Sequence, residues 1–512
     1  MWDDEASVVW FAENYNKYGE ILGYDGINLF SYRNGQLIND QLVYNNPPLD
    51  IYYTSYVIRF FGSDDFTVRL SFALLGFIAL GLFVGCFRMI AGKNTGWFLY
   101  GSAFLLLSTN YLLIEGNSRY YSLTFLFGSL SLLATLQLVK GELSSTGFKI
   151  IWLIIQLISI YFMFLSHYLA AVCWWVMCFF ILLQNKTIRI NSKHGFTWIA
   201  ALLNIACLFF VGKYFLQHKV LSRPDMINED SMGIKYLKLF GWLFNDLNRV
   251  SIIPFIMTAV IVFLFLFKRK ILTSEFKKLM AFSLVFLFLS ALLNPQPTSK
   301  SICFDIRYIY PAFPLLYLIA GYLFSLIHQH FRNGKYISFI LAVIYINSTL
   351  LSFMPNNTPV RWLLPNFVKE RIFPFPTAYT ASLDYIKSHF KERKKILTIP
   401  GYHNTVFLRY YSDKIEITNT LDINTPLSKK VVDSLGMNCL FMKQCKPDFV
   451  FLFGKDAEYE LSPYKAADYR YVDTIPVFAS GTDITRPELF WHSFGPVKNI
   501  DLSKDALYIF HD

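Results

Sequence analysis

Charged residues are scarce in this chain of 512 residues: Asp, Glu, Lys and Arg make up 16% of it, whereas a soluble domain carries about a quarter. The deficit is concentrated in long charge-free segments, which exclude a disordered chain, a fibre and a soluble enzyme. Many of these segments reach the ~18 apolar residues that cross a hydrocarbon core about 30 Å thick. They include 70–87, 94–114, 120–139, 150–185, 195–212, 279–299, 308–331 and 336–360. The sequence therefore predicts a polytopic α-helical membrane protein.

Cysteine is also rare, with seven in the whole chain, which excludes a disulfide-rich scaffold. Four of the seven fall inside apolar runs and are expected to pack as small hydrophobic residues: Cys86, Cys173, Cys178 and Cys207. Cys439 and Cys445 lie in the more polar C-terminal part. If that part is extracytoplasmic, they could form a local disulfide; two free thiols are the alternative.

Basic residues exceed acidic ones, 47 to 36, which gives a formal net charge of +11. Their placement argues against a nucleic-acid partner, because they crowd into short loops between apolar runs. Loops rich in Lys and Arg stay on the cytoplasmic side of a membrane. The basic loops, predicted to be cytoplasmic, are 140–149, 185–196, 268–278 and 328–335. Alternation then places outside both chain ends and the loops 116–119, 166–167, 217–250 and 295–307.

We predict ten spanning helices within a bundle at residues 67–354. Their approximate bounds are 67–89, 97–115, 120–139, 149–165, 168–184, 197–216, 251–268, 277–294, 308–327 and 336–354. Residues 1–66 then form a first extracytoplasmic loop with juxtamembrane helices. Since nothing near Met1 resembles a signal peptide, we expect one further helix to precede this segment.

The composition changes near residue 355. Five prolines lie between Pro355 and Pro376, and they predict a linker at 355–377 that is not one continuous helix. Residues 378–512 are predicted to form a small extracytoplasmic α/β domain, because helical and strand patterns alternate there. The expected helices are 381–391 and 405–411, and the expected strands are 395–399, 414–418 and 448–453.

Acidic and polar residues gather on the predicted outer side. The chain begins Trp2-Asp3-Asp4-Glu5-Ala6, Asn46-Pro47-Pro48 follows, and Ser63-Asp64-Asp65 opens the first span, with Arg69 one turn in. Each feature also has a purely structural interpretation. The acidic residues could form a solvated terminus, Ser63 is a natural helix N-cap followed by acids that favour a helix start, and Arg69 could extend to the membrane surface.

Further polar residues occur in the other outer loops. Glu115, Asn117, Arg119 and Tyr120 fill one short loop, His167 and Tyr168 form a hinge, and Asp305, Arg307 and Tyr308 precede a span. Ionisable groups near a membrane are costly, so several on one side indicate a shared site. The alternative is interfacial anchoring by Arg and Tyr, and capping of backbone groups in the case of His167.

This set of groups suits one kind of chemistry. An outer carboxylate can take a proton from an acceptor hydroxyl or amine, while a basic group holds a phosphate as it leaves. An apolar cavity that opens to the bilayer could accept a lipid tail. Together these features favour sugar transfer from a lipid-phosphate carrier.

An ordered series of short motifs also resembles a known class. Asp4-Glu5-Ala6, Asn46-Pro47-Pro48-Leu49 and Phe61-Gly62 followed by Thr67-Val68-Arg69-Leu70-Ser71 are similar to the membrane-embedded GT-C glycosyltransferases. Dolichyl-phosphate-mannose protein mannosyltransferases and bacterial aminoarabinose-to-lipid-A transferases are the nearest in pattern. The motifs that begin at Arg119, Ser166 and Arg307 fit the same series, so the resemblance covers residues 2 to about 330.

The resemblance implies an inverting transferase that moves a hexosyl or pentosyl group from a polyprenyl-phosphate carrier to an extracytoplasmic lipid, protein or polysaccharide. It implies Asp4 as the general base and Glu5 as its support or as a substrate anchor. Arg119 and Arg307 would bind the donor phosphate. The residues expected to line the cavity are Tyr120, His167, Tyr308 and Asn46. No cofactor is required, and whether the acidic cluster binds a divalent metal stays open. The expected location is a bacterial inner or plasma membrane.

One departure from the pattern concerns the sugar. Asn46 stands where relatives that modify lipid A carry Lys, which puts an aminoarabinose substrate in doubt. Two other functions remain as alternatives. A transporter or lipid flippase would show charges within spans and inverted repeats, which are not evident here; a non-catalytic subunit of a cell-envelope glycan assembly would keep the helices without needing the carboxylate.

Overall fold

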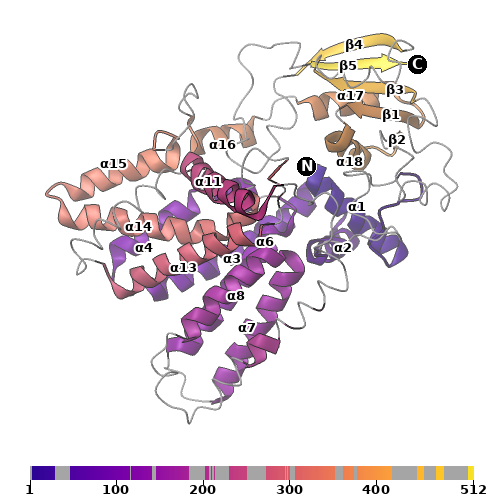
Figure 1. Cartoon of the computed structure of the whole chain (residues 1–512). Helices are drawn as coiled ribbons and strands as arrows, with labels where there is room; N and C mark the ends of the chain where they lie inside the picture. Colours follow the sequence, from indigo (N-terminus) through magenta and orange to yellow (C-terminus); the bar gives the residue numbers. More distant parts are fainter. Residues whose placement is uncertain are drawn as a thin grey trace.

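The computed structural model has two parts, a bundle of long helices and a smaller domain in which helices pack on a sheet (Figure 1). The N-terminal helix lies between them. The structure describes residues 3–28, 47–115, 117–140, 146–183, 202–206, 209, 213, 230–250, 272–294, 296, 298–299, 306–351, 361–373, 377–399, 401–417, 447–454, 469–477 and 506–512.

The bundle consists of apolar helices joined by short connections. Its described elements are α3 (Asp65–Ala91), α4 (Thr95–Leu106), α5 (Thr109–Glu115), α6 (Tyr120–Lys140), α7 (Thr146–Ser166), α8 (Tyr168–Leu183), α13 (Ser274–Leu292), the 3-10 helix η2 (Ile306–Ala312), α14 (Phe313–His330) and α15 (Gly334–Asn347). Four described segments are long and apolar enough to cross a membrane, at 65–91, 120–139, 147–166 and 307–330. The spans expected at 197–216 and 251–268 lie largely outside the described residues, and the number ten stays a prediction.

The span expected at 97–115 is broken rather than continuous. Helices α4 and α5 meet at an angle of 50°. The side chain of Ser108, between them, accepts a hydrogen bond from the backbone N–H of Tyr111 at 3.4 Å and also contacts the Tyr317 hydroxyl. A serine that bonds to the backbone offers an alternative to the helical ladder and favours the start of a new helix, which accounts for the break.

Close packing holds the bundle together. Gly101 of α4 and Gly321 of α14 bring their helices into backbone contact: a Cβ on Gly321 would lie 2.4 Å from the Gly101 nitrogen. The Trp97 indole beside them donates to the Leu318 carbonyl oxygen at 2.7 Å. Cys86, Cys173 and Cys178 are buried free thiols, as predicted, whereas the other cysteines named above lie outside the described residues.

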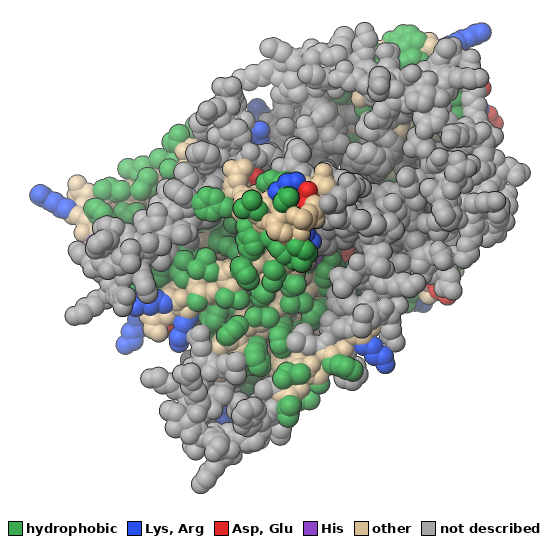
Figure 2. All heavy atoms as spheres, in the orientation of Figure 1, with side chains coloured by type: hydrophobic (Ala, Val, Ile, Leu, Met, Phe, Trp, Pro, Cys, Tyr) green, Lys and Arg blue, Asp and Glu red, His purple; other side chains and the backbone are tan. Residues whose placement is uncertain are grey.

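The outward face of α3 is apolar. Its large exposed side chains recur every three or four residues, at Phe66, Leu70, Leu74, Phe77 and Ile78. Hydrophobic side chains cover most of the described face of the bundle, and Lys and Arg lie mainly toward its edges (Figure 2). Such a continuous apolar surface would be unfavourable in water and suits the hydrocarbon core of a bilayer.

Two helices lie at one end of the bundle, α1 (Asp3–Tyr18) and α2 (Leu49–Phe61). They share a hydrophobic cluster with the beginnings of α3 and α6, in which Phe11, Ile51, Phe72 and Leu123 are buried. A further amphipathic helix, α11 (Met232–Val250), packs near α13. The N-terminal segment therefore packs on the bundle rather than extending into solvent.

The smaller domain follows α16 (Leu364–Ile372), which lies within the predicted linker. Its elements are α17 (Ala378–His389), β1 (Lys394–Ile399), α18 (Gly401–Tyr411), β2 (Ile415–Ile417), β3 (Phe449–Phe453), β4 (Arg470–Pro476) and β5 (Ala506–His511). The strand order is β2-β1-β3-β5-β4; β1 pairs in parallel with β2 and β3, and β5 runs antiparallel to its neighbours. Helices α17 and α18 pack on one sheet face around Ile386, Phe407 and Phe451. The predicted fold class, a polytopic helical membrane protein with a small C-terminal α/β domain, is confirmed.

Candidate functional site

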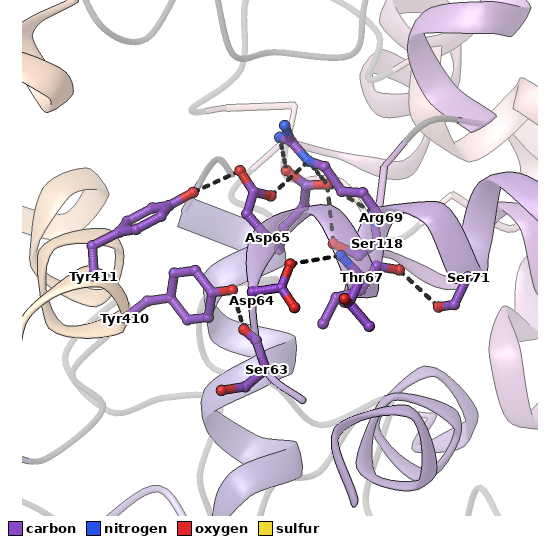
Figure 3. A network of polar contacts seen from close by, with 11 residues as sticks. Ser63, Asp64, Asp65, Thr67, Arg69, Ser71, Ser118, Tyr410 and Tyr411 are labelled. Carbon is purple, nitrogen blue, oxygen red and sulfur yellow. Dashed lines mark hydrogen bonds and ion pairs between the residues drawn. The ribbon is translucent and has the colours of Figure 1, made fainter. Parts of the chain in front are cut away.

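A network of charged and polar side chains lies where α1, the beginning of α3, the loop before α6 and α18 meet (Figure 3). Glu5, one of the two predicted catalytic acids, lies at its centre. Its side chain is 0% exposed although it is two residues into the first helix of the structure. The interpretation of the acidic N-terminus as a solvated end is therefore wrong for Glu5.

The Glu5 carboxylate binds two partners that are distant in sequence. Arg69 of α3 donates to it from Nη2 at 2.5 Å and from Nε at 3.1 Å. Ser118 donates from its backbone N–H at 2.7 Å and from its hydroxyl at 3.1 Å. A bidentate pair between arginine and a carboxylate is strong and fixes the orientation of both groups. Glu5 thus ties α1 to α3 and to the short loop that precedes α6.

Arg69 is held by two carboxylates, and its extension to the membrane surface stays a prediction. Besides Glu5, its Nε lies 3.3 Å from Asp65 Oδ1, one helical turn earlier. The predicted N-cap is also wrong by one residue: Asp64, not Ser63, caps α3 and accepts from the Thr67 N–H at 2.9 Å. Asp64 is the cap because its side chain accepts from the backbone N–H three residues later, which is the usual capping geometry.

The C-terminal domain contacts the same network through α18. The Tyr411 hydroxyl donates to Asp65 Oδ2 at 2.8 Å, and the Tyr410 hydroxyl donates to the Ser63 carbonyl oxygen (Figure 3). Arg409 Nε donates to Asp25 Oδ2 at 2.8 Å. Val406 joins the hydrophobic cluster around α1. The polar network at the end of the bundle is therefore covered from one side by the soluble domain.

Three predicted site residues form a continuous row of rings: Tyr120, His167 and Tyr308. A fourth predicted site residue, Arg119, lies at one end of this row. The Arg119 guanidinium lies over the Tyr120 ring, 5.2 Å from its centre. The Tyr120 ring lies 4.8 Å from the His167 ring, and His167 lies 6.0 Å from Tyr308. Arg307 precedes Tyr308 in the same turn of η2 and is half-buried. Residues from three predicted outer loops thus meet at one place.

His167 also caps backbone groups, the alternative role expected for it. Its Nδ1 accepts from the Ala170 backbone N–H at 3.1 Å, which caps the beginning of α8. The ring is only 7% exposed. Because one nitrogen is engaged with the backbone, the ring is held in a fixed orientation against Tyr120 and Tyr308.

Asp50 is a member of the site that the sequence did not indicate. It lies in the first turn of α2, is 5% exposed, and accepts from the Ile51 N–H at 2.9 Å. Burial raises the pKa of Asp50 from 3.8 to about 6, although the nearby charge of Arg119 opposes the rise. A buried carboxylate beside a half-buried guanidinium costs desolvation energy that such a pair only partly recovers. The sole sequence signal is an acid at the start of the aromatic segment that follows Pro47-Pro48.

A second buried carboxylate lies deeper, at the end of α5. Glu115 is 6% exposed, and Tyr111 and Ser122 are its polar neighbours. Its Oε2 packs so closely on Gly76 of α3 that a Cβ there would lie 2.2 Å away. Within the described residues, neither carboxylate oxygen of Glu115 has a well-aligned hydrogen-bond partner. A glycine is thus required at position 76 to accommodate this acid.

Two predicted site residues cannot be placed by their side chains. Asp4 belongs to the first turn of α1, but its side chain lies outside the described residues, as does all of Asn46. In the described part of the chain, no group of three or more His, Cys, Asp or Glu residues could hold a metal ion.

The architecture matches a known fold over nearly its whole length. The structure of ArnT from Cupriavidus metallidurans in the apo state superposes with a TM-score of 0.51, at 12% identity, over 92% of this chain and 91% of that one. The chain has the GT-C fold of ArnT. The structure of ArnT bound to undecaprenyl phosphate gives a TM-score of 0.50, at 11% identity, over 99% of this chain and 93% of the other. The sequence alone matches no family model and no curated protein.

Proposed function

We propose that this protein is an inverting glycosyltransferase that moves a sugar from a polyprenyl-phosphate carrier to an acceptor outside the cytoplasm. The observation that carries the proposal is the ArnT fold, shared over 92% of the chain, with charged and aromatic residues from separate loops gathered at one end of the bundle. One ArnT structure holds undecaprenyl phosphate. This supports a polyprenyl phosphate as the lipid partner of this chain. The transferred group would be a hexosyl or a pentosyl group.

The roles of the arginines follow from their positions. Arg119 lies on an aromatic ring beside Asp50, and Arg307 is one residue from the Tyr308 ring at the other end of the same row. Either guanidinium group could bind the donor phosphate and stabilise the charge that develops as it leaves. Tyr120, His167 and Tyr308 would then face the sugar or the first part of the lipid.

Glu5 and Asp4 are assigned different tasks. Because Glu5 accepts four hydrogen bonds from Arg69 and Ser118, its oxygens are occupied, and it holds the site together. Asp4, next to it in the first turn of α1, is the proposed general base. An acceptor hydroxyl needs a base only to remove its proton as the anomeric bond forms, since phosphate is already a good leaving group. No metal is needed for that step.

Placement in the membrane completes the proposal. The basic loops would lie in the cytoplasm of a bacterial cell, with the charged cluster and the C-terminal domain on the outer side of its inner membrane. The acceptor would be a lipid, a protein or a polysaccharide of the cell envelope. Asn46, in place of a lysine that could touch phosphate, supports a sugar other than aminoarabinose.

Complementation in the native host tests the proposal. The gene is deleted and restored as wild type, as Asp4→Asn or as the matched control Asp3→Asn, with expression of each full chain verified. Mass spectrometry of envelope glycans should show one sugar lost on deletion, restored by wild type and Asp3→Asn, and absent with Asp4→Asn. Unchanged glycans after deletion would overturn the transferase function, whereas full restoration by Asp4→Asn would remove only Asp4 from the mechanism.

A further inference from the structure

The contact between the C-terminal domain and the helix bundle ends on the residues that hold the candidate site. Tyr411 is the last residue of α18, and its hydroxyl donates to Asp65 at 2.8 Å. Asp65 in turn lies 3.3 Å from Arg69 Nε, and Arg69 holds Glu5 with two hydrogen bonds. A series of four polar groups therefore connects the soluble domain to the first turns of α1 (Figure 3).

The other contacts of α18 show that this arrangement is built rather than incidental. Arg409 donates to Asp25, whose side chain is 6% exposed, and the Tyr410 hydroxyl donates to a backbone carbonyl oxygen just before α3. Val406 is buried in the cluster that contains α1 residues. Three consecutive residues of one helix thus each bind a different part of the N-terminal region.

We propose that Tyr411 is a positioning residue of the glycosyltransferase site: by holding Asp65, it fixes the Arg69–Glu5 pair and with it the first turn of α1, which carries Asp4. This inference rests on the proposed function for its catalytic consequence, but not for its geometry. It makes the C-terminal domain part of the site and not only an appended module.

The physical reason lies in how Arg69 is shared. A guanidinium placed between two carboxylates can turn toward either one, and the position of the second acid determines the geometry of the first pair. The Tyr411 hydroxyl restricts Asp65, because a tyrosine hydroxyl is a directional donor to one carboxylate oxygen. Burial and the Asp65 charge raise the pKa of Tyr411, so the hydroxyl keeps its proton and remains a donor at any physiological pH.

The test uses the full-length protein in lipid nanodiscs, as wild type, Tyr411→Phe, Asp65→Ala and the double variant. Tyr410→Phe is the matched control, since it removes the neighbouring hydroxyl without touching a carboxylate. The first readout is hydrogen–deuterium exchange of the backbone amides in residues 5–12 and 66–70. The second is the affinity for undecaprenyl phosphate, measured by isothermal titration calorimetry.

Tyr411→Phe should increase exchange in residues 5–12 by about tenfold or more, in line with the loss of a hydrogen bond to a charged acceptor. It should also weaken the binding of undecaprenyl phosphate. In the Asp65→Ala background the same substitution should add nothing, because alanine has no side-chain acceptor and both changes therefore remove the same hydrogen bond. Tyr410→Phe should leave the exchange of residues 5–12 as in the wild type.

Two outcomes would overturn the inference. One is an effect of Tyr411→Phe that persists in full in the Asp65→Ala background. The other is a change confined to the thermal stability of the C-terminal domain, with unchanged exchange in α1, which a purely structural tyrosine would produce. If the wild type binds no undecaprenyl phosphate at all, the proposed function fails, while the exchange measurements still decide the role of Tyr411.

Discussion

Glu5 and Arg69 are 64 residues apart in sequence and form a bidentate ion pair, with Nη2 and Oε2 2.5 Å apart. The carboxylate is fully buried, whereas 29% of the arginine side chain is exposed. The pair joins the first helix of the chain to the first membrane span. Its formation makes the N-terminal segment part of the folded bundle.

Removing either charge alone should be costly. Glu5→Gln should lower the free energy of unfolding by about 3 kcal/mol, toward the low end for buried ion pairs because Arg69 is partly exposed. Combining Glu5→Gln with Arg69→Gln should cost less than the sum of the two single changes, since no uncompensated charge then remains. Thermal unfolding of the four proteins in detergent measures this coupling, and strictly additive effects would contradict the pair.

Asp50 should make stability depend on pH in the opposite sense to most acids. Its pKa is raised from 3.8 to about 6 by burial, so the folded state binds the proton more tightly than the unfolded state does. The favourable contribution of protonated Asp50 is complete below about pH 4 and is lost as the pH rises through about 6. At neutral pH the buried charge therefore opposes folding, which suits a group retained for its effect on Arg119.

The Asp50→Asn variant measures this contribution. Between about pH 4 and pH 8, the stability of the wild type relative to the variant should fall by roughly 3 kcal/mol, which is a shift of about two pKa units at 1.36 kcal/mol each. Asp64→Asn is the control: hydrogen bonds from Thr67 lower the pKa of Asp64, so its contribution is lost as the pH falls. Parallel pH profiles for both variants would contradict the assignment.

A third prediction concerns the glycine beneath the site. Gly76→Ala would place a Cβ 2.2 Å from Glu115 Oε2 and 3.4 Å from Glu115 Cβ, and overpacking of this kind costs about 1–3 kcal/mol. Glu115→Ala should relieve the clash, so Gly76→Ala should be nearly harmless in that background. The control is Gly81→Ala on the same helix, where nothing lies within 4 Å. The melting temperatures of these variants test the prediction. Equal losses of stability for Gly76→Ala and Gly81→Ala would refute it.

The parts of the fold that local sequence determines were predictable. Charge-free runs located α3, α6 and α7, because a helix in hydrocarbon must exclude charge along its whole length. Alternating patterns located α17, α18, β1 and β3. The sequence did not reveal β4 and β5: five of the seven residues in β4 are exposed, so it shows no apolar face, and its pairing with β5 joins segments that are distant in the chain.

The candidate site was predictable only in part. Residues at loop ends, such as Arg119, His167 and Tyr308, stood out because a polar residue beside a span is conspicuous. Asp50 and Tyr411 did not, since one lies among apolar residues and the other in a separate domain. Their importance comes from tertiary contacts, Asp50 with the Arg119 charge and Tyr411 with Asp65. No spacing rule encodes such contacts.

Arg119 offers a direct test of phosphate binding, because the chain contains a close structural counterpart. Arg119 lies over the Tyr120 ring at 5.2 Å, and Arg88 lies over the Phe98 ring at 5.3 Å. Arg88 is in the last turn of α3, 19 residues beyond Arg69 and hence about 28 Å along the helix from the site. The two arginines share their cation–π contact and differ in location.

Arg119→Gln should weaken undecaprenyl phosphate binding by about tenfold or more, the value of a charge-assisted hydrogen bond to phosphate, whereas Arg88→Gln should leave it unchanged. Titration of both variants and the wild type at two salt concentrations separates a specific phosphate contact from general electrostatic attraction. Loss of a phosphate contact also reduces the salt dependence of binding. If both arginines mattered equally, binding would reflect general attraction of a basic protein for anionic lipid. If neither mattered, the donor phosphate would have to bind away from the aromatic row.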